Sequence, residues 1–140
     1  MLRFRIRNAT HDRKRARLWI AIAYGNRGQY AEADSMLRTI EESRERLGRF
    51  ERLLVDWYRA SLDGQNLEAL RIIREADAFA PESRMANYLH GLEALNVNRP
   101  GETIATYLRF HDTPGEHRVI SVWRAGIFTE ASLPKPVFTP

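Results

Sequence analysis

The sequence predicts an all-α protein built from three similar helix pairs, and three observations support this prediction. A turn-forming residue followed five positions later by a small residue occurs three times. These residue pairs are Gly28 and Ala33, Gly64 and Ala69, and Asn98 and Thr103. Successive pairs lie 36 and 34 positions apart, which is close to the length of one two-helix repeat. Apolar residues at helical spacing surround each pair, and the 140 residues, 44% of them hydrophobic, suffice for one core.

The first helix pair is expected at residues 12–27 and 30–47. Two helices approach closely only where small residues meet, and Ala21 and Ala33 supply these residues. Gly28 lies between the helices, where the turn needs a residue that tolerates positive φ. Leu37 and Ile40 give the second helix its apolar face.

The second pair is expected at residues 50–63 and 66–80, and the third at 83–97 and 101–111. Gly64 is the turn residue of the second pair, and Pro81 ends this pair because proline cannot continue a helix. The packing residues of the second pair are Ala69, Ile73 and Ala76. The corresponding residues of the third pair are Gly91, Ala94, Asn98, Thr103, Tyr107 and Phe110, with Pro114 and Gly115 at its end.

A single helix is expected over residues 116–130. Its apolar stripe consists of Val119, Val122, Trp123, Gly126 and Ile127. Such a helix can cover the apolar side of the last pair in a repeat array. Ile120 and Phe128 lie off this stripe, so we expect the tail, another subunit or further repeats to cover them. The chain then divides into a basic N-terminal arm (1–11), a helical repeat domain (12–130) and a proline-containing tail (131–140).

The aromatic, glycine and alanine residues of positions 23–33, together with their two recurrences, resemble the tetratricopeptide repeat family. The resemblance covers about residues 14–117, as repeats 14–49, 50–83 and 84–117, followed by the capping helix 116–130. The tryptophan that the family pattern has early in each first helix is replaced by Arg17, Leu53 and Asn87. The resemblance implies a right-handed α-solenoid of antiparallel helix pairs with a C-terminal capping helix. It also implies a protein-interaction scaffold, which in bacteria is often part of a larger regulator.

In that family, the first helix of each pair lines a concave groove. The residues that helical phase places on this groove are Arg15, Leu18, Ile22, Glu51, Leu54, Tyr58, Tyr88 and Leu92, while Trp19 and Trp123 fit the groove or the core equally well. Because these side chains are mainly apolar, they favour an apolar or amphipathic peptide over an acidic peptide terminus, which needs paired asparagines and cations. The alternative is that these side chains cover one another or a second subunit.

The N-terminal segment is strongly basic. Residues 1–17 carry a net charge of +6, against +4 for the whole chain. The candidate phosphate contacts are Arg3, Arg5, Arg7, Arg13 and Lys14. Such a segment can bind nucleic acid through phosphates, or it can be a solvated arm without a ligand.

Within the same segment, Leu2, Phe4 and Ile6 alternate with arginines, which is the periodicity of a strand. A strand would need a partner in a second molecule or in a longer parent protein. Without such a partner we expect the segment to be disordered.

We expect no catalytic residue, cofactor or metal in this protein. The residues closest to a metal-binding cluster are His111, Asp112, Glu116 and His117, but their spacing matches no known ligand pattern. The sequence has no glycine-rich phosphate loop, nucleophile elbow or paired histidine zinc helix. It has no cysteine and no apolar run of membrane-spanning length, so we expect a cytoplasmic protein that does not bind membranes.

The sequence therefore predicts a non-catalytic scaffold that binds a protein or peptide partner in a concave groove. One alternative is a nucleic-acid-associated regulator that uses the arginine-rich arm. The other is an architectural protein that self-associates through its last helix.

Overall fold

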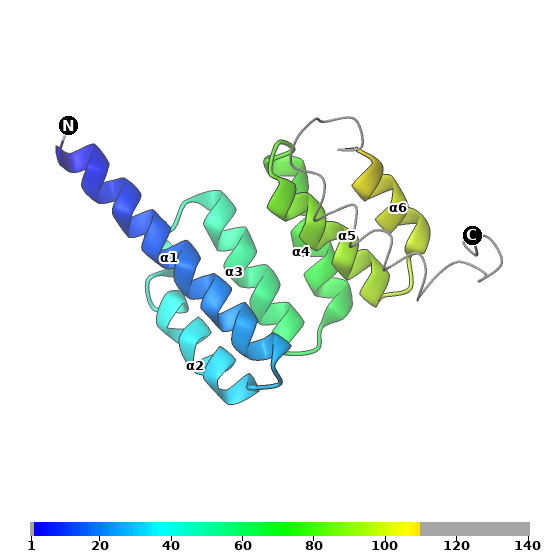
Figure 1. Ribbon diagram of the computed structural model, residues 1–140, viewed down its shortest axis with the longest axis horizontal. Helices are drawn as coiled ribbons and strands as arrows, with labels where there is room; N and C mark the ends of the chain where they lie inside the picture. Colours follow the sequence, from blue (N-terminus) through cyan, green and yellow to red (C-terminus); the bar gives the residue numbers. More distant parts are fainter. Residues whose placement is uncertain (1, 110–140) are drawn as a thin grey trace, which may run out of the picture. The chain divides into compact units, whose positions relative to one another are not determined.

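The computed structural model describes residues 2–109, with side chains from Arg13 onward, and this part of the chain contains helices and no strand (Figure 1). The helices are α1 (Leu2–Asn26), α2 (Tyr30–Glu41), the short 3-10 helix η1 (Arg44–Arg46), α3 (Arg49–Leu62), α4 (Asn66–Phe79), α5 (Arg84–Asn96) and α6 (Pro100–Leu108). The chain divides into two compact units, residues 1–80 and 81–140. The first unit contains α1 to α4, and the described part of the second contains α5 and α6.

The three turns that join α1 to α2, α3 to α4 and α5 to α6 share one backbone geometry. Their turn residues Gly28, Gly64 and Asn98 have φ angles of 74°, 75° and 59°, and no other described residue has a positive φ. In each turn, the next residue donates its N–H to the carbonyl five positions earlier, at 2.8–2.9 Å. This bond is the one that ends a helix in the Schellman motif. The prediction of three equivalent turns is confirmed.

Small residues lie at the core of the first helix pair, as predicted. Ala21 of α1 and Ala33 of α2 have no exposed surface, and Leu37 and Ile40 are buried as well. α2 ends at Glu41, earlier than predicted. The hydroxyl of Ser43 donates to the Ile40 carbonyl at 3.1 Å, and this side-chain bond competes with continuation of the helix.

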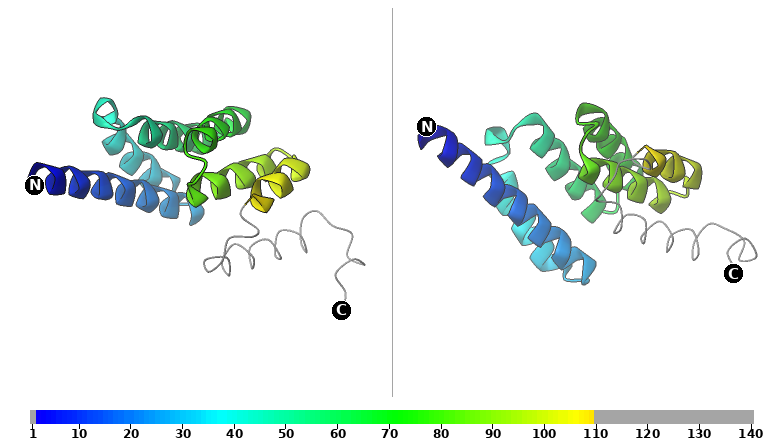
Figure 2. Two further views of the ribbon diagram at one scale, coloured as in Figure 1. Left: turned by 90° about the horizontal axis from the view of Figure 1, so that it is seen from above. Right: turned by 45° about the horizontal axis from the view of Figure 1, so that its top comes forward.

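The helix α1 begins at Leu2, ten residues before the predicted start. The expectation of a strand or a disordered arm at residues 2–7 is therefore wrong. Arginine and leucine are strong helix formers, and the alternating pattern of this short segment does not outweigh that preference. Figures 1 and 2 show that this part of α1 extends beyond α2 and α3 of the same unit.

The second helix pair has the predicted packing residues in its core. Ala69, Ile73 and Ala76 of α4 are completely buried. At the surface of the pair, the guanidinium of Arg49 lies 4.6 Å from the ring centre of Phe79. The helix α4 ends at Phe79, two residues before the predicted terminator Pro81.

The second unit is built around contacts between α5 and α6. Tyr107 is 2% exposed and packs against Gly91, and its hydroxyl donates to the Tyr88 carbonyl at 3.1 Å. The Thr103 hydroxyl donates to the Gly91 carbonyl at 2.9 Å. These contacts confirm the predicted packing roles of Gly91, Thr103 and Tyr107. The predicted helix 116–130 and the tail lie outside the described residues.

Candidate functional site

Four of the predicted groove residues line one small depression in the first unit. Arg15 and Leu18 come from α1, and Glu51 and Leu54 come from α3. The other lining residues are Lys14, Ile40, Leu47 and Val55. The free space inside is about 10 Å³, roughly the room for one water molecule. Small-molecule sites usually enclose about 300 Å³ or more, so the depression is far smaller than such a site.

An ion pair forms the polar edge of this depression. A guanidinium nitrogen of Arg15 lies 2.9 Å from a carboxylate oxygen of Glu51. The Arg15 side chain is 49% exposed, so this pair adds little to stability. It does hold a cation and a carboxylate at fixed positions on the surface, next to apolar residues.

Three of the predicted groove residues are buried in the core of the first unit. Leu18, Leu54 and Tyr58 are 6%, 1% and 6% exposed. The Tyr58 hydroxyl donates to the Ala21 carbonyl at 2.9 Å, and burial raises the pKa of Tyr58. The expectation that these side chains contact a ligand directly is corrected, because packing between α1 and α3 covers them. Leu18 and Leu54 form part of the apolar lining of the depression, and Tyr58 holds α3 against α1.

The remaining predicted groove residues are more accessible. Ile22 of α1 is half-buried, and Trp19, one turn before it on the same helix, is 43% exposed. Tyr88 and Leu92 are half-buried in the second unit, where the Tyr88 ring stacks on Tyr107 at a centre distance of 6.3 Å. In the first unit, Trp19 and Ile22 therefore keep accessible apolar surface on the same helix as Arg15 and Leu18.

The candidate phosphate contacts all lie on α1. Arg3, Arg5 and Arg7 are in its first turns, outside the range of described side chains. Arg13 is exposed and has no ion-pair partner among the described residues, whereas Lys14 lines the depression. The structure thus brings one of these five residues to the predicted groove.

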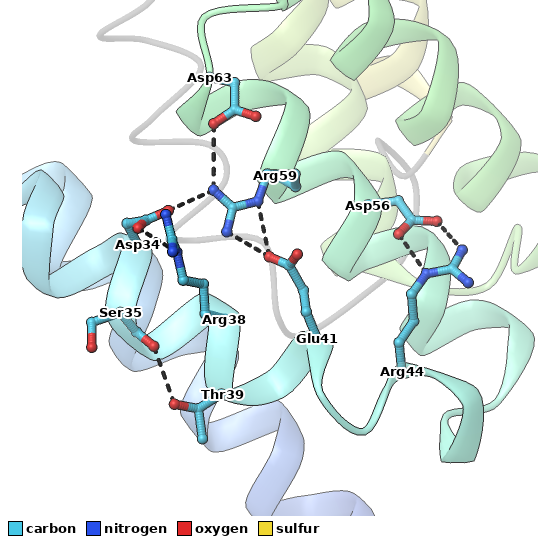
Figure 3. A network of polar contacts seen from close by, with 9 residues as sticks. All are labelled: Asp34, Ser35, Arg38, Thr39, Glu41, Arg44, Asp56, Arg59 and Asp63. Atoms are coloured by element: carbon cyan, nitrogen blue, oxygen red, sulfur yellow. Dashed lines mark hydrogen bonds and ion pairs between the residues drawn. The ribbon is translucent and has the colours of Figure 1, made fainter.

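A network of charged side chains joins α2 to α3 (Figure 3). Arg59 of α3 donates to Asp34 at 2.7 Å and to Glu41 at 2.6 Å, both on α2. Arg44 binds Asp56 with two nitrogens. Burial alone would lower the pKa of Arg59, but the hydrogen bonds to Glu41 and Asp34 raise it above its ordinary value.

The same network changes the acidity of a carboxyl group. The hydrogen bond from Arg59 lowers the pKa of Asp34 below its ordinary value of 3.8. Every carboxylate of the network faces an arginine. The network connects α2 of the first helix pair to α3 of the second.

Ile20 was not among the predicted site residues, and its side chain is 45% exposed. Its position two residues after the buried Leu18 places it on the opposite side of α1, because two residues span about 200° of a helix. The exposure of Ile20 could have been predicted from helical phase, in the same way as the groove residues.

The first unit also contains a second hollow. A wide hollow of about 410 Å³ on α1 and α2 is open to solvent and lined by Tyr24, Ala31, Glu32, Ser35, Met36 and Thr39. Residues 13–109 contain no group of three histidines or carboxylates that could hold a metal. In the described part of the chain, no helix combines the length and apolar character that crossing a membrane requires. The candidate cluster His111, Asp112, Glu116 and His117 lies outside that part.

Comparison of the chain with protein-family models, with curated proteins and with solved structures finds no match. The functional assignment therefore depends on the sequence and on the geometry of the described residues.

Proposed function

We propose that this protein is a non-catalytic scaffold that binds an apolar or amphipathic peptide segment of a protein partner. The observation that carries the proposal is that the Arg15–Glu51 ion pair and the buried side chains of Leu18 and Leu54 line one depression of the first unit, the ion pair at its accessible edge. Helical phase selected these residues from two separate segments of the sequence. Their meeting at one place, on the unit that also carries the exposed Trp19, is what a peptide-binding surface requires.

We further propose that the helix pairs are antiparallel hairpins in a right-handed α-solenoid of the tetratricopeptide type. The support is the recurrence of one turn geometry at Gly28, Gly64 and Asn98. A buried residue follows each turn five positions later, and these residues are Ala33, Ala69 and Thr103.

Recognition on the first unit would depend on three features. Trp19 and Ile22 provide an apolar platform for a Leu, Phe or Met side chain of the peptide. The depression next to them accepts the tip of that side chain. Arg15 orients the peptide by donating hydrogen bonds to its carbonyl or carboxylate oxygens.

A display experiment with random peptides of about 12 residues tests the proposal, since this length spans a helix face of about 18 Å. We expect selected peptides to share a large apolar residue, and the Trp19→Ala variant to bind them about 30-fold more weakly, as for an interface hot spot. The matched control is Leu67→Ala, because Leu67 is 69% exposed on α4 and away from the depression.

Two outcomes would contradict the peptide-binding proposal. One is that no peptide is enriched over an unrelated helical protein. The other is that Trp19→Ala and Leu67→Ala weaken binding equally. A salt-dependent interaction with a mixed-sequence DNA or RNA duplex that survives Trp19→Ala would instead favour the nucleic-acid alternative.

A further inference from the structure

The side of α1 that faces away from the core is an exposed stripe. Leu18 and Ala21 mark the buried side of this helix. The exposed stripe consists of Arg13, Ala16, Arg17, Ile20 and Ala23, with Arg27 directly after the helix. Arg13, Arg17 and Ile20 are spaced by four and three positions, and Ile20 is four positions after Ala16 and three before Ala23, so the residues lie along one broad side of the helix. They do not include the residues of the proposed peptide site.

The centre of this stripe has the composition of a helix-packing surface. Ala16, Ile20 and Ala23 follow each other at i, i+4 and i+7, and all three are exposed. Small residues on both sides of a larger apolar one allow a second helix to approach closely. The same protein uses this device where α1 meets α2, through Ala21 and Ala33.

The stripe carries arginines at its two ends and along one side. Arg13, Arg17 and Arg27 have no side-chain hydrogen bond or ion pair among the described residues. Elsewhere in the first unit, Arg44 and Arg59 are held by carboxylates. The only acidic residue in the sequence of α1 is Asp12. A partner that covers the stripe must therefore bring its own negative charges.

The charge pattern also decides between kinds of partner. A second copy of the chain would place arginines against arginines across the contact, which is unfavourable. An anionic membrane surface requires strong segregation of apolar and polar residues, and this segregation is weak along α1. Nucleic acid would use the arginines but would leave the exposed Ile20 without a role.

We infer that this stripe is a second docking surface, distinct from the peptide site, for an amphipathic helix with a seam of small and apolar residues flanked by aspartates or glutamates. The docked helix packs its seam on Ala16, Ile20 and Ala23. Its carboxylates pair with Arg13, Arg17 and Arg27. Because α1 continues beyond α2 and α3 of its own unit (Figure 2), the partner helix can lie along it over several turns.

The test uses the whole chain and a synthetic helical peptide of about 21 residues, with an Ala and Leu seam flanked by glutamates, long enough to span about six turns. Its matched control has lysines in place of the glutamates. Binding is measured by calorimetry for the wild type, Arg17→Glu, Arg46→Glu and Ile20→Ser. Arg17 and Arg46 are both exposed and have no ion-pair partner in the part of the chain whose side chains are described, and each substitution changes the net charge by the same amount.

We expect the acidic peptide to bind and the lysine peptide not to bind. Arg17→Glu should weaken binding by about tenfold or more, Arg46→Glu by less than about twofold, and Ile20→Ser by about tenfold. Circular dichroism checks that each variant remains helical. The inference is overturned if the acidic peptide does not bind, if Arg17→Glu and Arg46→Glu act equally, or if Ile20→Ser has no effect. It is also overturned if phosphatidylglycerol vesicles or a DNA duplex bind more tightly than the peptide with the same dependence on Arg17.

Discussion

The contact between Gly25 and Tyr58 permits a sharp test of how α1 packs on α3. A methyl group at Gly25 would overlap the Tyr58 hydroxyl oxygen but would lie 3.6 Å from the ring carbon Cζ, an ordinary contact distance. The hydroxyl is not free to move, because Tyr58 is 6% exposed and donates to the Ala21 carbonyl. Gly25→Ala should therefore break this hydrogen bond.

The size of the effect follows from two opposing contributions. Replacing a helical glycine by alanine stabilises a helix by up to about 1 kcal/mol. Leaving a buried hydroxyl without its partner costs about 1–3 kcal/mol, and moving the ring adds a packing cost of about 1–3 kcal/mol. The two costs together exceed the gain, so we expect Gly25→Ala to lower the free energy of unfolding by about 1–6 kcal/mol.

The double-mutant cycle isolates the clash. Tyr58→Phe alone should cost about 1 kcal/mol for the lost hydrogen bond. In the Tyr58→Phe background the overlapping oxygen is gone, so Gly25→Ala should become neutral or stabilising by up to about 1 kcal/mol. The assay is urea unfolding followed by circular dichroism. If Gly25→Ala destabilises both backgrounds equally, the close approach of α1 to Tyr58 is refuted.

Three further predictions concern the turns, the second unit and the charged network. Gly64→Ala should lower the free energy of unfolding by about 1–2 kcal/mol, because φ is 75° there, whereas Asn98→Gly should be nearly neutral; urea unfolding measures both. Gly91→Ala should cost about 1–3 kcal/mol in the same assay, because the new methyl would lie 2.6 Å from Cζ of the buried tyrosine of α6. Arg59→Gln should raise the pKa of Asp34 toward 3.8, as measured by NMR titration.

The pH dependence of the last variant has a defined sign. A carboxyl group whose pKa is lowered by folding stabilises the folded state above its unfolded pKa, and this stabilisation disappears as the pH falls through the folded value. The stability difference between wild type and Arg59→Gln should therefore be largest at neutral pH and should shrink below about pH 3.8. A pH-independent difference would show that Arg59 acts by packing alone.

Controls for the glycine variants come from the same chain. No atom lies within 4 Å of a methyl group placed at Gly101, in the first turn of α6, and its φ is not positive. Gly101→Ala should therefore be neutral or slightly stabilising. Destabilisation by Gly101→Ala equal to that by Gly91→Ala would contradict the proposed contact with Tyr107.

The helical class, the three turns and the small residues that follow them could be predicted from the amino-acid sequence alone. Each of these depends on local chemistry, because only residues that tolerate positive φ fit the turn and only small ones fit where helices cross. For this reason Gly28, Gly64 and Asn98 could be found without coordinates. The alternation of Leu2, Phe4 and Ile6 misled the prediction, since so short a pattern is weaker than the helix preference of the residues between them.

Which side chains remain accessible could be seen only in the folded chain. Helical phase assigned Leu18, Leu54 and Trp19 to the groove side of their helices. It could not show that Leu18 and Leu54 are buried whereas Trp19 is exposed. Exposure depends on how deeply α1 and α3 pack together, and that depth is set by contacts between distant residues such as Gly25 and Tyr58. A periodic pattern gives the direction of a side chain, whereas its burial is a property of the neighbours that folding brings to it.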